Sequence, residues 1–392
     1  MLIETTAGDL RIALEKVKPG IERGSMPILQ AVLLSDGGVT TTNLDYEIRV
    51  KFAAKRFTGA CAVPFHQLHD LLKRLPKQTD IRIQATEHNG YGVYVLFEGA
   101  RYYLPSFTAS DFPVFSYEEQ PAPMAKPDGL INALRICQPF ISTEDTRYYL
   151  NGICFSKDAE GNGVVVATDG HRLGAVPYAH ELNASVILPR TVLPALFGLS
   201  EPESVFVGKL RMEFTYPGGG WVKTKLIDGV FPDWLRVVPN LAPDAPRLKF
   251  SPKEMYAVLR RMDIARTRHR TSIDICATAT GDLVTATCKG MDGEECAERL
   301  EQGYAANWSK LTSSVISFNS GYLKQVCSLN LDAEEVTLTT ADASSPALID
   351  NPDSKTLMIL MPMRGDGSLA GQSLLTLARK SNDSVAAGQV AA

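Results

Sequence analysis

LRIALEKV at residues 10–17 decides how this chain folds, because apolar side chains follow three, four and seven positions after Leu10. That spacing predicts an amphipathic helix with one buried face. The pattern returns as LINALRIC at residues 130–137 and as MYAVLRRM at residues 255–262, after shifts of 120 and 125 residues. The recurrence indicates three copies of one structural unit.

Each copy also contains a second helical pattern and a strand-turn-strand signature. In the third copy, Ser251, Pro252 and Glu254 are typical of a capping box at a helix start. A unit of about 120 residues with two helices and several antiparallel strands is an α+β domain. The second helical patterns lie at residues 68–75, 192–199 and 323–327. The predicted domains are residues 1–120, 123–241 and 246–364, followed by a flexible C-terminal extension at residues 365–392.

The composition excludes several classes of protein. Of 392 residues, 45% are hydrophobic, and 40 Lys and Arg against 44 Asp and Glu give a formal net charge of -4. The chain lacks the run of about 18 apolar residues that a membrane span requires. It also lacks a secretory signal, so we expect a cytoplasmic protein without a membrane partner. Seven scattered cysteines without CxxC spacing predict reduced thiols in the core rather than a disulfide or zinc framework.

Basic residues gather on or beside the repeated helices, although the chain is acidic in sum. They are Lys16, Lys18, Arg23, Lys73, Arg74, Lys77, Arg260 and Arg261. A helix-lined basic surface of this kind would hold a polyanion loosely, without reading bases. Ordinary solvated helix faces explain the same pattern, and both interpretations stay open at this point.

Six segments, in order along the chain, resemble a known family. They are SMPIL at 25–29, ASDFP at 109–113, RYYLNG at 147–152, ATDGHRL at 167–173, KLIDGVFPD at 225–233 and MPMR at 361–364. Together they closely resemble the bacterial DNA polymerase III β subunit, the sliding clamp. The resemblance covers residues 1 to about 364.

The resemblance implies a head-to-tail homodimeric ring of six α+β domains around double-stranded DNA. Such a ring tethers a polymerase topologically, so weak and sequence-independent phosphate contacts suffice and no net positive charge is needed. Members are accessory proteins without catalysis or cofactor. The implied partners are a second copy of the chain, the DNA polymerase III α subunit, an ATP-driven clamp loader and other proteins with a QLxLF-type motif.

The resemblance also implies a partner-peptide pocket between the second and third domains. Its residues would be Leu150, Thr168, Gly170, His171, Arg172, Leu173, Pro232, Arg236, Val237, Ser345, Ile359, Leu360, Met361, Pro362 and Met363. Leu, Val, Ile and Met side chains would form an adaptable apolar groove for an extended peptide. Arg172 and Arg236 would hold polar groups at its rim.

Further positions carry over from the family. Arg23, Arg147, Tyr148 and Tyr149 match DNA-contacting positions, although core packing explains the two tyrosines equally well. Tyr102 and Leu104 of the first domain are expected to meet a surface near Ile264 of the third domain across the protomer interface.

Two departures from the family bear on partner binding. His269 stands where a better-known member carries phenylalanine. The extension contains QSLLTL at residues 372–377, which resembles the partner motif except for serine at its second position. The hypothesis is that this segment folds into the pocket and competes with partners. An accidental spacing in a disordered tail is the alternative.

Other functions remain as alternatives. Asp169 and His171 could form an acid-base dyad, and Asp45 and Asp292 could be carboxylate ligands of a metal, but the sequence has no His pair with metal spacing and no phosphate loop. Asp169 is more consistent with a turn after a strand. The Arg364-Gly365-Asp366 triplet is interpreted as a coincidence. A clamp-like paralogue with a repair, tolerance or regulatory role is the closer alternative.

Overall fold

The structure is a computed structural model. It describes residues 1–22, 24, 26–86, 91–115, 122–124, 127–182, 184–265, 271–311, 314–365, 367 and 369. The chain divides into two compact units. Unit 1 contains residues 1–135, 152–155 and 178–229, and unit 2 contains residues 136–151, 156–177 and 230–392. Arg23, His269 and the 372–377 segment lie outside the described residues.

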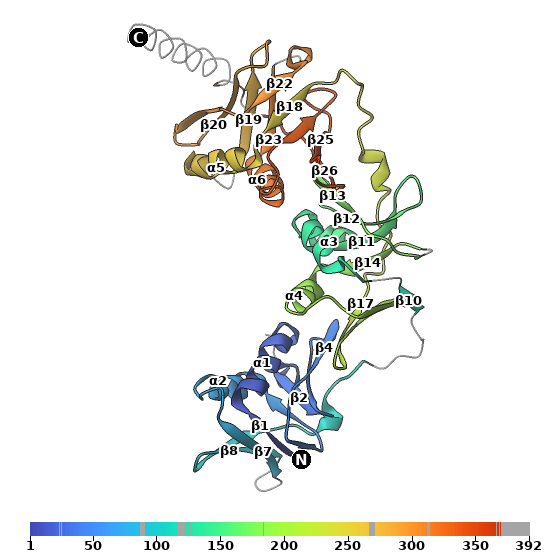
Figure 1. The fold of residues 1–392 in the computed structure, drawn as a ribbon, viewed down its shortest axis with the longest axis vertical. Coiled ribbons are helices and arrows are strands. Elements are labelled where there is room, and N and C mark those ends of the chain that lie inside the picture. The colour runs from blue at the N-terminus through green and yellow to red at the C-terminus, as the bar shows by residue number, and fades with distance from the viewer. Residues whose placement is uncertain are drawn as a thin grey trace. The chain divides into compact units, whose positions relative to one another are not determined.

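The first sheet of unit 1 is antiparallel, and the first repeat also forms two helices. The strand order of the sheet is β5-β1-β7-β8-β9. Helices α1 (Ala7–Val17) and α2 (Phe65–Lys73) pack against each other (Figure 1). Thr6 caps α1 by accepting a hydrogen bond from the Asp9 amide, and the apolar stripe predicted at residues 10–17 is buried. The strands are β1 (Leu2–Thr6), β5 (Arg56–Thr58), β7 (Asp80–Thr86), β8 (Gly92–Phe97) and β9 (Ala100–Pro105).

The second sheet of unit 1 joins strands from two sequence repeats. Its order is β10-β15-β16-β17-β4-β3-β2-β6. Strand β17 of the second repeat pairs with β4 of the first, with Trp221 opposite Arg49 and Lys223 opposite Glu47. The strands are β2 (Ala31–Ser35), β3 (Gly38–Thr42), β4 (Tyr46–Lys51), β6 (Cys61–Pro64), β10 (Ala122–Met124), β15 (Ser204–Val207), β16 (Arg211–Tyr216) and β17 (Gly220–Lys225).

The second repeat also forms helices α3 (Leu130–Cys137) and α4 (Leu193–Phe197). Strand β14 (Val186–Pro189) pairs with β11 (Gly152–Lys157). Helix α3 coincides with the predicted stripe at 130–137. Helix α4 lies within the second pattern at 192–199 but is only five residues long, with Pro194 in its first turn and Gly198 as its C-cap.

Unit 2 contains a long strand run and a four-stranded sheet. The run is β12-β13-β26-β25-β24-β18-β22, and the sheet is β21-β20-β19-β23. Helices α5 (Pro252–Met262) and α6 (Ser320–Leu329) lie side by side next to the four-stranded sheet (Figure 1). The run comprises β12 (Gly163–Thr168), β13 (Arg172–Pro177), β18 (Arg247–Phe250), β22 (Tyr304–Ala306), β24 (Val336–Thr339), β25 (Ala347–Asp350) and β26 (Leu357–Leu360). The sheet comprises β19 (Ser272–Ala277), β20 (Val284–Lys289), β21 (Glu295–Leu300) and β23 (Val315–Asn319).

The helix start predicted at Ser251 is confirmed, with one difference. The Ser251 hydroxyl accepts a hydrogen bond from the Glu254 amide at 3.5 Å. The Glu254 carboxylate instead accepts from the amides of Glu301 and Gln302, at 2.6 and 3.0 Å. It therefore ties α5 to the end of β21 rather than closing a capping box.

The α+β class and the six helical patterns are confirmed, whereas the domain boundaries at 1–120, 123–241 and 246–364 stay a prediction. Among the described residues, no helix is both long enough and apolar enough to cross a membrane. All seven cysteines are free. Five are buried, as predicted, but Cys288 and Cys296 are only partly buried.

Candidate functional site

Strands β13 and β26 bring the two halves of the predicted pocket together within unit 2. Arg172 lies opposite Leu360 and Leu173 opposite Ile359. Beyond the paired residues, the Met361 amide donates to the His171 carbonyl at 2.8 Å. The strand ladder therefore continues into the Met361–Met363 segment and positions it beside the turn before β13.

The turn before β13 is built from short polar side chains. Asp169 Oδ1 accepts from the amides of His171 and Arg172, at 2.9 and 3.1 Å. Thr168 Oγ1 accepts from the Gly170 amide at 3.1 Å. Gly170 has a φ of +88°, and a Cβ there would lie 2.6 Å from an Arg147 nitrogen. The prediction that Asp169 turns the chain after a strand is confirmed, and glycine is required at position 170.

Arg172 is not at the rim, which corrects the expected role. Its side chain is buried, and Nε forms an ion pair with Asp169 Oδ2 at 2.9 Å. One guanidinium nitrogen donates to Gln325 Oε1, and the guanidinium carbon lies 4.1 Å from the centre of the Tyr322 ring. A planar guanidinium can satisfy all three neighbours at once. Arg172 therefore holds the β13 turn against α6.

The apolar members of the predicted pocket differ in burial. Leu150, Leu173, Ile359 and Leu360 are buried. Met361 and Pro362 are partly buried, and Met363 is exposed. Flexible thioether side chains adapt to different partners at low conformational cost, so the surface available to a ligand is the Met361–Met363 segment and exposed His171.

Ser345 lies near the same strands, two residues before β25. Its amide and hydroxyl both donate to the Asp342 carboxylate, at 2.8 Å each. These bonds and two from Ser344 lower the pKa of Asp342 to about 2. Ser345 therefore orders a turn, and Ala347 at the start of β25 pairs with Leu360.

The short 3-10 helix Trp234–Val237 contains two further predicted pocket residues, Arg236 and Val237, and Pro232 lies two residues before it. All three are exposed. The β13–β26 pairing does not itself place them beside Met361. Buried Trp234 anchors the segment by donating from Nε1 to Ser156 Oγ at 3.3 Å. Arg236 is held by Asp233 at 3.1 Å.

The predicted DNA-contacting residues of unit 2 lie on the 3-10 segment Asp145–Leu150. The Arg147 guanidinium forms an ion pair with Glu144 at 2.8 Å, which lowers the pKa of that carboxyl. Tyr148 is 53% exposed and meets Tyr149 edge to face at 5.8 Å. The alternative interpretation of Tyr148 as a core residue is therefore wrong. Arg147 already has a carboxylate partner.

The predicted interface residues are found in different surroundings. In unit 1, Tyr102 on the end strand β9 is 48% exposed and stacks on Phe97 at 5.5 Å, but Leu104 is buried within the unit. In unit 2, Ile264 is 79% exposed on the 3-10 turn Asp263–Ala265. Tyr102 and Ile264 are accessible to another chain, and Leu104 supports its strand from within.

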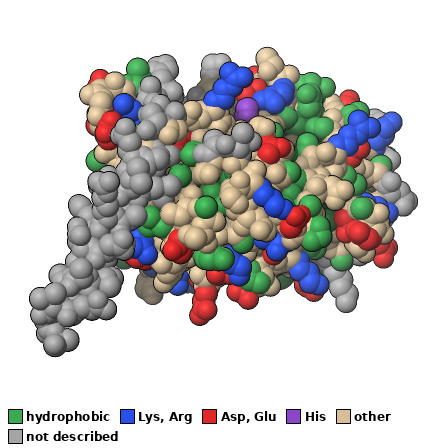
Figure 2. Space-filling view, turned by 90° about the horizontal axis from the view of Figure 1, so that it is seen from above, with side chains coloured by type: hydrophobic (Ala, Val, Ile, Leu, Met, Phe, Trp, Pro, Cys, Tyr) green, Lys and Arg blue, Asp and Glu red, His purple; other side chains and the backbone are tan. Residues whose placement is uncertain are grey.

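The predicted basic residues of the helices are exposed, and one of them, Arg261, has a carboxylate partner. Lys16, Lys73, Arg74 and Arg260 are exposed, whereas Arg261 forms an ion pair with Glu298 at 2.5 Å. On the face drawn in Figure 2, Lys and Arg side chains are interspersed with Asp and Glu. A mixed surface of this kind favours loose rather than tight contact with a polyanion.

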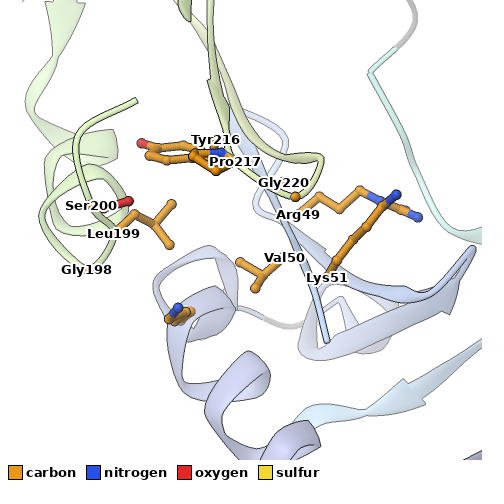
Figure 3. Close-up of a pocket in the computed structure, with 11 residues that line it drawn as sticks. Arg49, Val50, Lys51, Gly198, Leu199, Ser200, Tyr216, Pro217 and Gly220 are labelled. Carbon is orange, nitrogen blue, oxygen red and sulfur yellow. The ribbon is translucent and has the colours of Figure 1, made fainter. Parts of the chain in front are cut away.

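A cavity in unit 1 was missed by sequence analysis. It has a volume of about 270 Å³ and lies where β4 meets the β16–β17 hairpin and the end of α4. Leu199, Val50 and Tyr216 approach it from different elements, and Lys51 extends beside the hairpin glycines (Figure 3). The Arg49 guanidinium is already engaged outside the cavity, because it donates hydrogen bonds to Ser35 and Thr40. The cavity depends on the pairing of β4 with β17, which no local pattern indicates.

Comparisons with known proteins agree with this architecture. The family model of the N-terminal domain of the DNA polymerase III beta subunit matches residues 5–116, and that of its central domain matches residues 126–233. The beta sliding clamp of Caulobacter vibrioides is 30% identical over 374 residues, which cover 90% of this chain and 96% of the relative. The chain belongs to the bacterial sliding clamp family.

Other sliding clamps are similar at greater distance. The beta sliding clamp of Escherichia coli K12 is 28% identical, with 87% of this chain and 93% of the relative covered. A sliding clamp structure from Bartonella birtlesii, bound to griselimycin, has a TM-score of 0.81 and 27% identity, with 93% and 99% covered. A DNA polymerase III β subunit structure from Pseudomonas aeruginosa has a TM-score of 0.79 and 26% identity, with 93% and 100% covered.

Sliding clamps are processivity factors of DNA polymerase that bind DNA and polymerase partners and have no catalysis of their own. Because members of this family are not catalytic, an acid-base dyad of Asp169 and His171 is not supported. Among the described residues, no group of three His, Cys, Asp or Glu side chains could hold a metal ion. No finding favours a paralogue role.

Proposed function

We propose that this clamp works as a head-to-tail homodimeric ring that encircles double-stranded DNA without sequence preference. Three α+β domains per chain, with the predicted boundaries, would give six per ring. Exposed basic residues on α1, α2 and α5 support loose contact with phosphates. Exposed Tyr102 and Ile264 support an interface between protomers.

The site around Met361 is the proposed docking site for the DNA polymerase III α subunit, the clamp loader and other proteins with QLxLF-type motifs. The observation that carries this proposal is the hydrogen bond from the Met361 amide to the His171 carbonyl. It brings a methionine-containing surface segment beside His171, at the end of paired strands whose Leu173, Ile359 and Leu360 side chains are buried. Apolar anchors of an extended peptide fit such a surface, and Arg236 and Val237 complete the proposed set.

The proposed site can be tested with Met361→Asp. The variant places a carboxylate on the apolar surface, and binding a leucine side chain against it would desolvate that charge. We expect the affinity for a fluorescent QLxLF peptide to fall by more than tenfold in anisotropy measurements. Sedimentation of the same samples should still give a dimer, because Met361 is not among the residues proposed for the protomer interface.

Met26→Asp is the matched control, because Met26 is 53% exposed and lies outside the proposed site. It should bind the peptide like the parent chain. Equal affinity of the Met361→Asp variant would reject this location for the pocket. A wild-type chain that stays monomeric at micromolar concentration would reject the ring.

A further inference from the structure

Two of the seven cysteines differ from the rest in their surroundings. Cys61, Cys137, Cys154, Cys276 and Cys327 are buried. Cys288 on β20 and Cys296 on β21 are partly exposed, and the strand register places them directly opposite each other. Side chains of directly opposed residues in an antiparallel pair point to the same face of the sheet, so the two thiols face each other.

The register also fixes their separation. At the hairpin end, the Gly290 amide donates to the Glu294 carbonyl at 2.7 Å. Hydrogen-bonded and non-hydrogen-bonded pairs alternate along an antiparallel ladder, so Cys288 and Cys296, two steps along, are a hydrogen-bonded pair with Cα atoms about 5.5 Å apart. Disulfides span Cα separations of roughly 4.4–6.8 Å. The Cα separation of the pair therefore falls within the range that a disulfide spans.

The two thiols lie in different surroundings. Cys288 Sγ lies 4.0 Å from the Met262 carbonyl at the end of α5, and it lines a cavity of only about 10 Å³. That space is smaller than a bulky adduct requires. Cys296 is on β21, the end strand of the sheet among the described strands, and does not line this cavity.

We propose that Cys288 and Cys296 are a reversible dithiol-disulfide pair that reacts with low-molecular-weight disulfides. The Cys296 thiolate attacks the reagent disulfide, forms a mixed disulfide and releases one thiol. The Cys288 thiolate then attacks the Cys296 sulfur and releases the second thiol. The pair loses two electrons and two protons, and the reagent disulfide is reduced to two thiols. Burial raises the pKa of Cys288 to about 12, so the second step accelerates as pH rises.

The disulfide would lock the β20–β21 hairpin below the end of α5. Arg261 of α5 is already paired with Glu298 of β21, and the next turn carries exposed Ile264. Oxidation would therefore stiffen the surface proposed to meet a second protomer. This consequence rests on the proposed ring, whereas the disulfide chemistry does not.

The full chain, reduced and then exposed to glutathione disulfide at pH 8, tests the pair by intact mass and by non-reducing peptide mapping. We expect loss of two hydrogen atoms per chain, a cross-link between the peptides of Cys288 and Cys296, and full reversal by dithiothreitol. Cys288→Ser should stop at a glutathione adduct on Cys296, and Cys296→Ser should form neither product. A wild-type chain that keeps seven thiols, retains a stable adduct or cross-links elsewhere would overturn the proposal.

Sedimentation of the oxidised and reduced chains separates the chemistry from the ring. A change of threefold or more in the dimer dissociation constant would support the coupling to Ile264. Disulfide formation with an unchanged dissociation constant would overturn that coupling and leave the pair standing. A monomer in both states would overturn the proposed ring, while the mass data would still decide the pair.

Discussion

Replacing Glu47 by glutamine should stabilise the protein at alkaline pH. Glu47 on β4 is only 2% exposed, and its carboxylate accepts from the Phe115 amide at 2.8 Å. Burial raises the pKa of this carboxyl to about 7, against the opposing effects of the Phe115 amide and of Lys223 and Arg49. The structure thus favours a neutral group at a position where an ionised one is normal in the unfolded chain.

The pH window follows from the direction of the shift. Because the folded-state pKa lies above the unfolded one, the contribution of Glu47 to stability is fully present below about pH 4.5 and is lost as pH rises through 7. A pKa shift of that size corresponds to a loss of at most about 3 kcal/mol in the free energy of unfolding. Glutamine can still accept from the Phe115 amide and never ionises, so it should retain the stability that Glu47 loses.

The assay is urea unfolding from pH 4.5 to pH 8.5, followed by tryptophan fluorescence, to which Trp221 on β17 of the same sheet contributes together with the other two tryptophans of the chain. Glu47→Gln and the parent chain should unfold alike at the acidic end. The variant should gain about 1–3 kcal/mol at the alkaline end. Exposed Glu203→Gln is the control and should stay within about 0.5 kcal/mol of the parent throughout. A Glu47→Gln variant that is less stable at pH 8.5 would show that Lys223 and Arg49 outweigh burial.

Three further results are expected. Arg172→Ala should destabilise unit 2 by about 3 kcal/mol in urea unfolding, because it leaves the buried Asp169 carboxylate without its ion-pair partner; a loss below 1 kcal/mol would contradict this. Gly170→Ala should cost about 1–2 kcal/mol in the same assay, because φ is +88° and the Cβ would press on Arg147, and an unchanged midpoint would refute that strain. If QSLLTL at residues 372–377 competes for the pocket, deletion of residues 366–392 should raise the anisotropy-measured peptide affinity, and an unchanged affinity would reject the competition.

Patterns within a short stretch of sequence were sufficient for the helices. The period of apolar residues at 10–17, 130–137 and 255–262 predicted α1, α3 and α5, because one buried face is enough to specify a helix. The turn at Asp169 was equally local, since its carboxylate bonds amides two and three residues ahead. Such features depend on neighbours in sequence and can be predicted without a fold.

Features that depend on distant residues were missed or misassigned. Arg172 was expected at the rim, but it bonds Gln325, which is 153 positions away. The spacing of the cysteines in the sequence does not indicate that Cys288 and Cys296 are neighbours, because only the register of β20 and β21 places them opposite each other. Strand β17 pairs with β4 of another repeat, since strand edges are satisfied by tertiary neighbours. The proposed site residues on β13 and β26 likewise come together only through strand pairing.

The backbone, rather than the side chains, sets the position of the candidate site. Met361 is held by the His171 carbonyl, and the Met363 amide donates to the Ser317 carbonyl, both at 2.8 Å. Beyond them, the Gly367 amide donates to buried Asp274 at 2.9 Å. Because the amides of Met361 and Met363 make these bonds, their side chains are free to adapt while the chain path stays fixed. Replacing Met361 should therefore change what binds without changing where the segment lies, which is why a charge there is a test of recognition and not of folding.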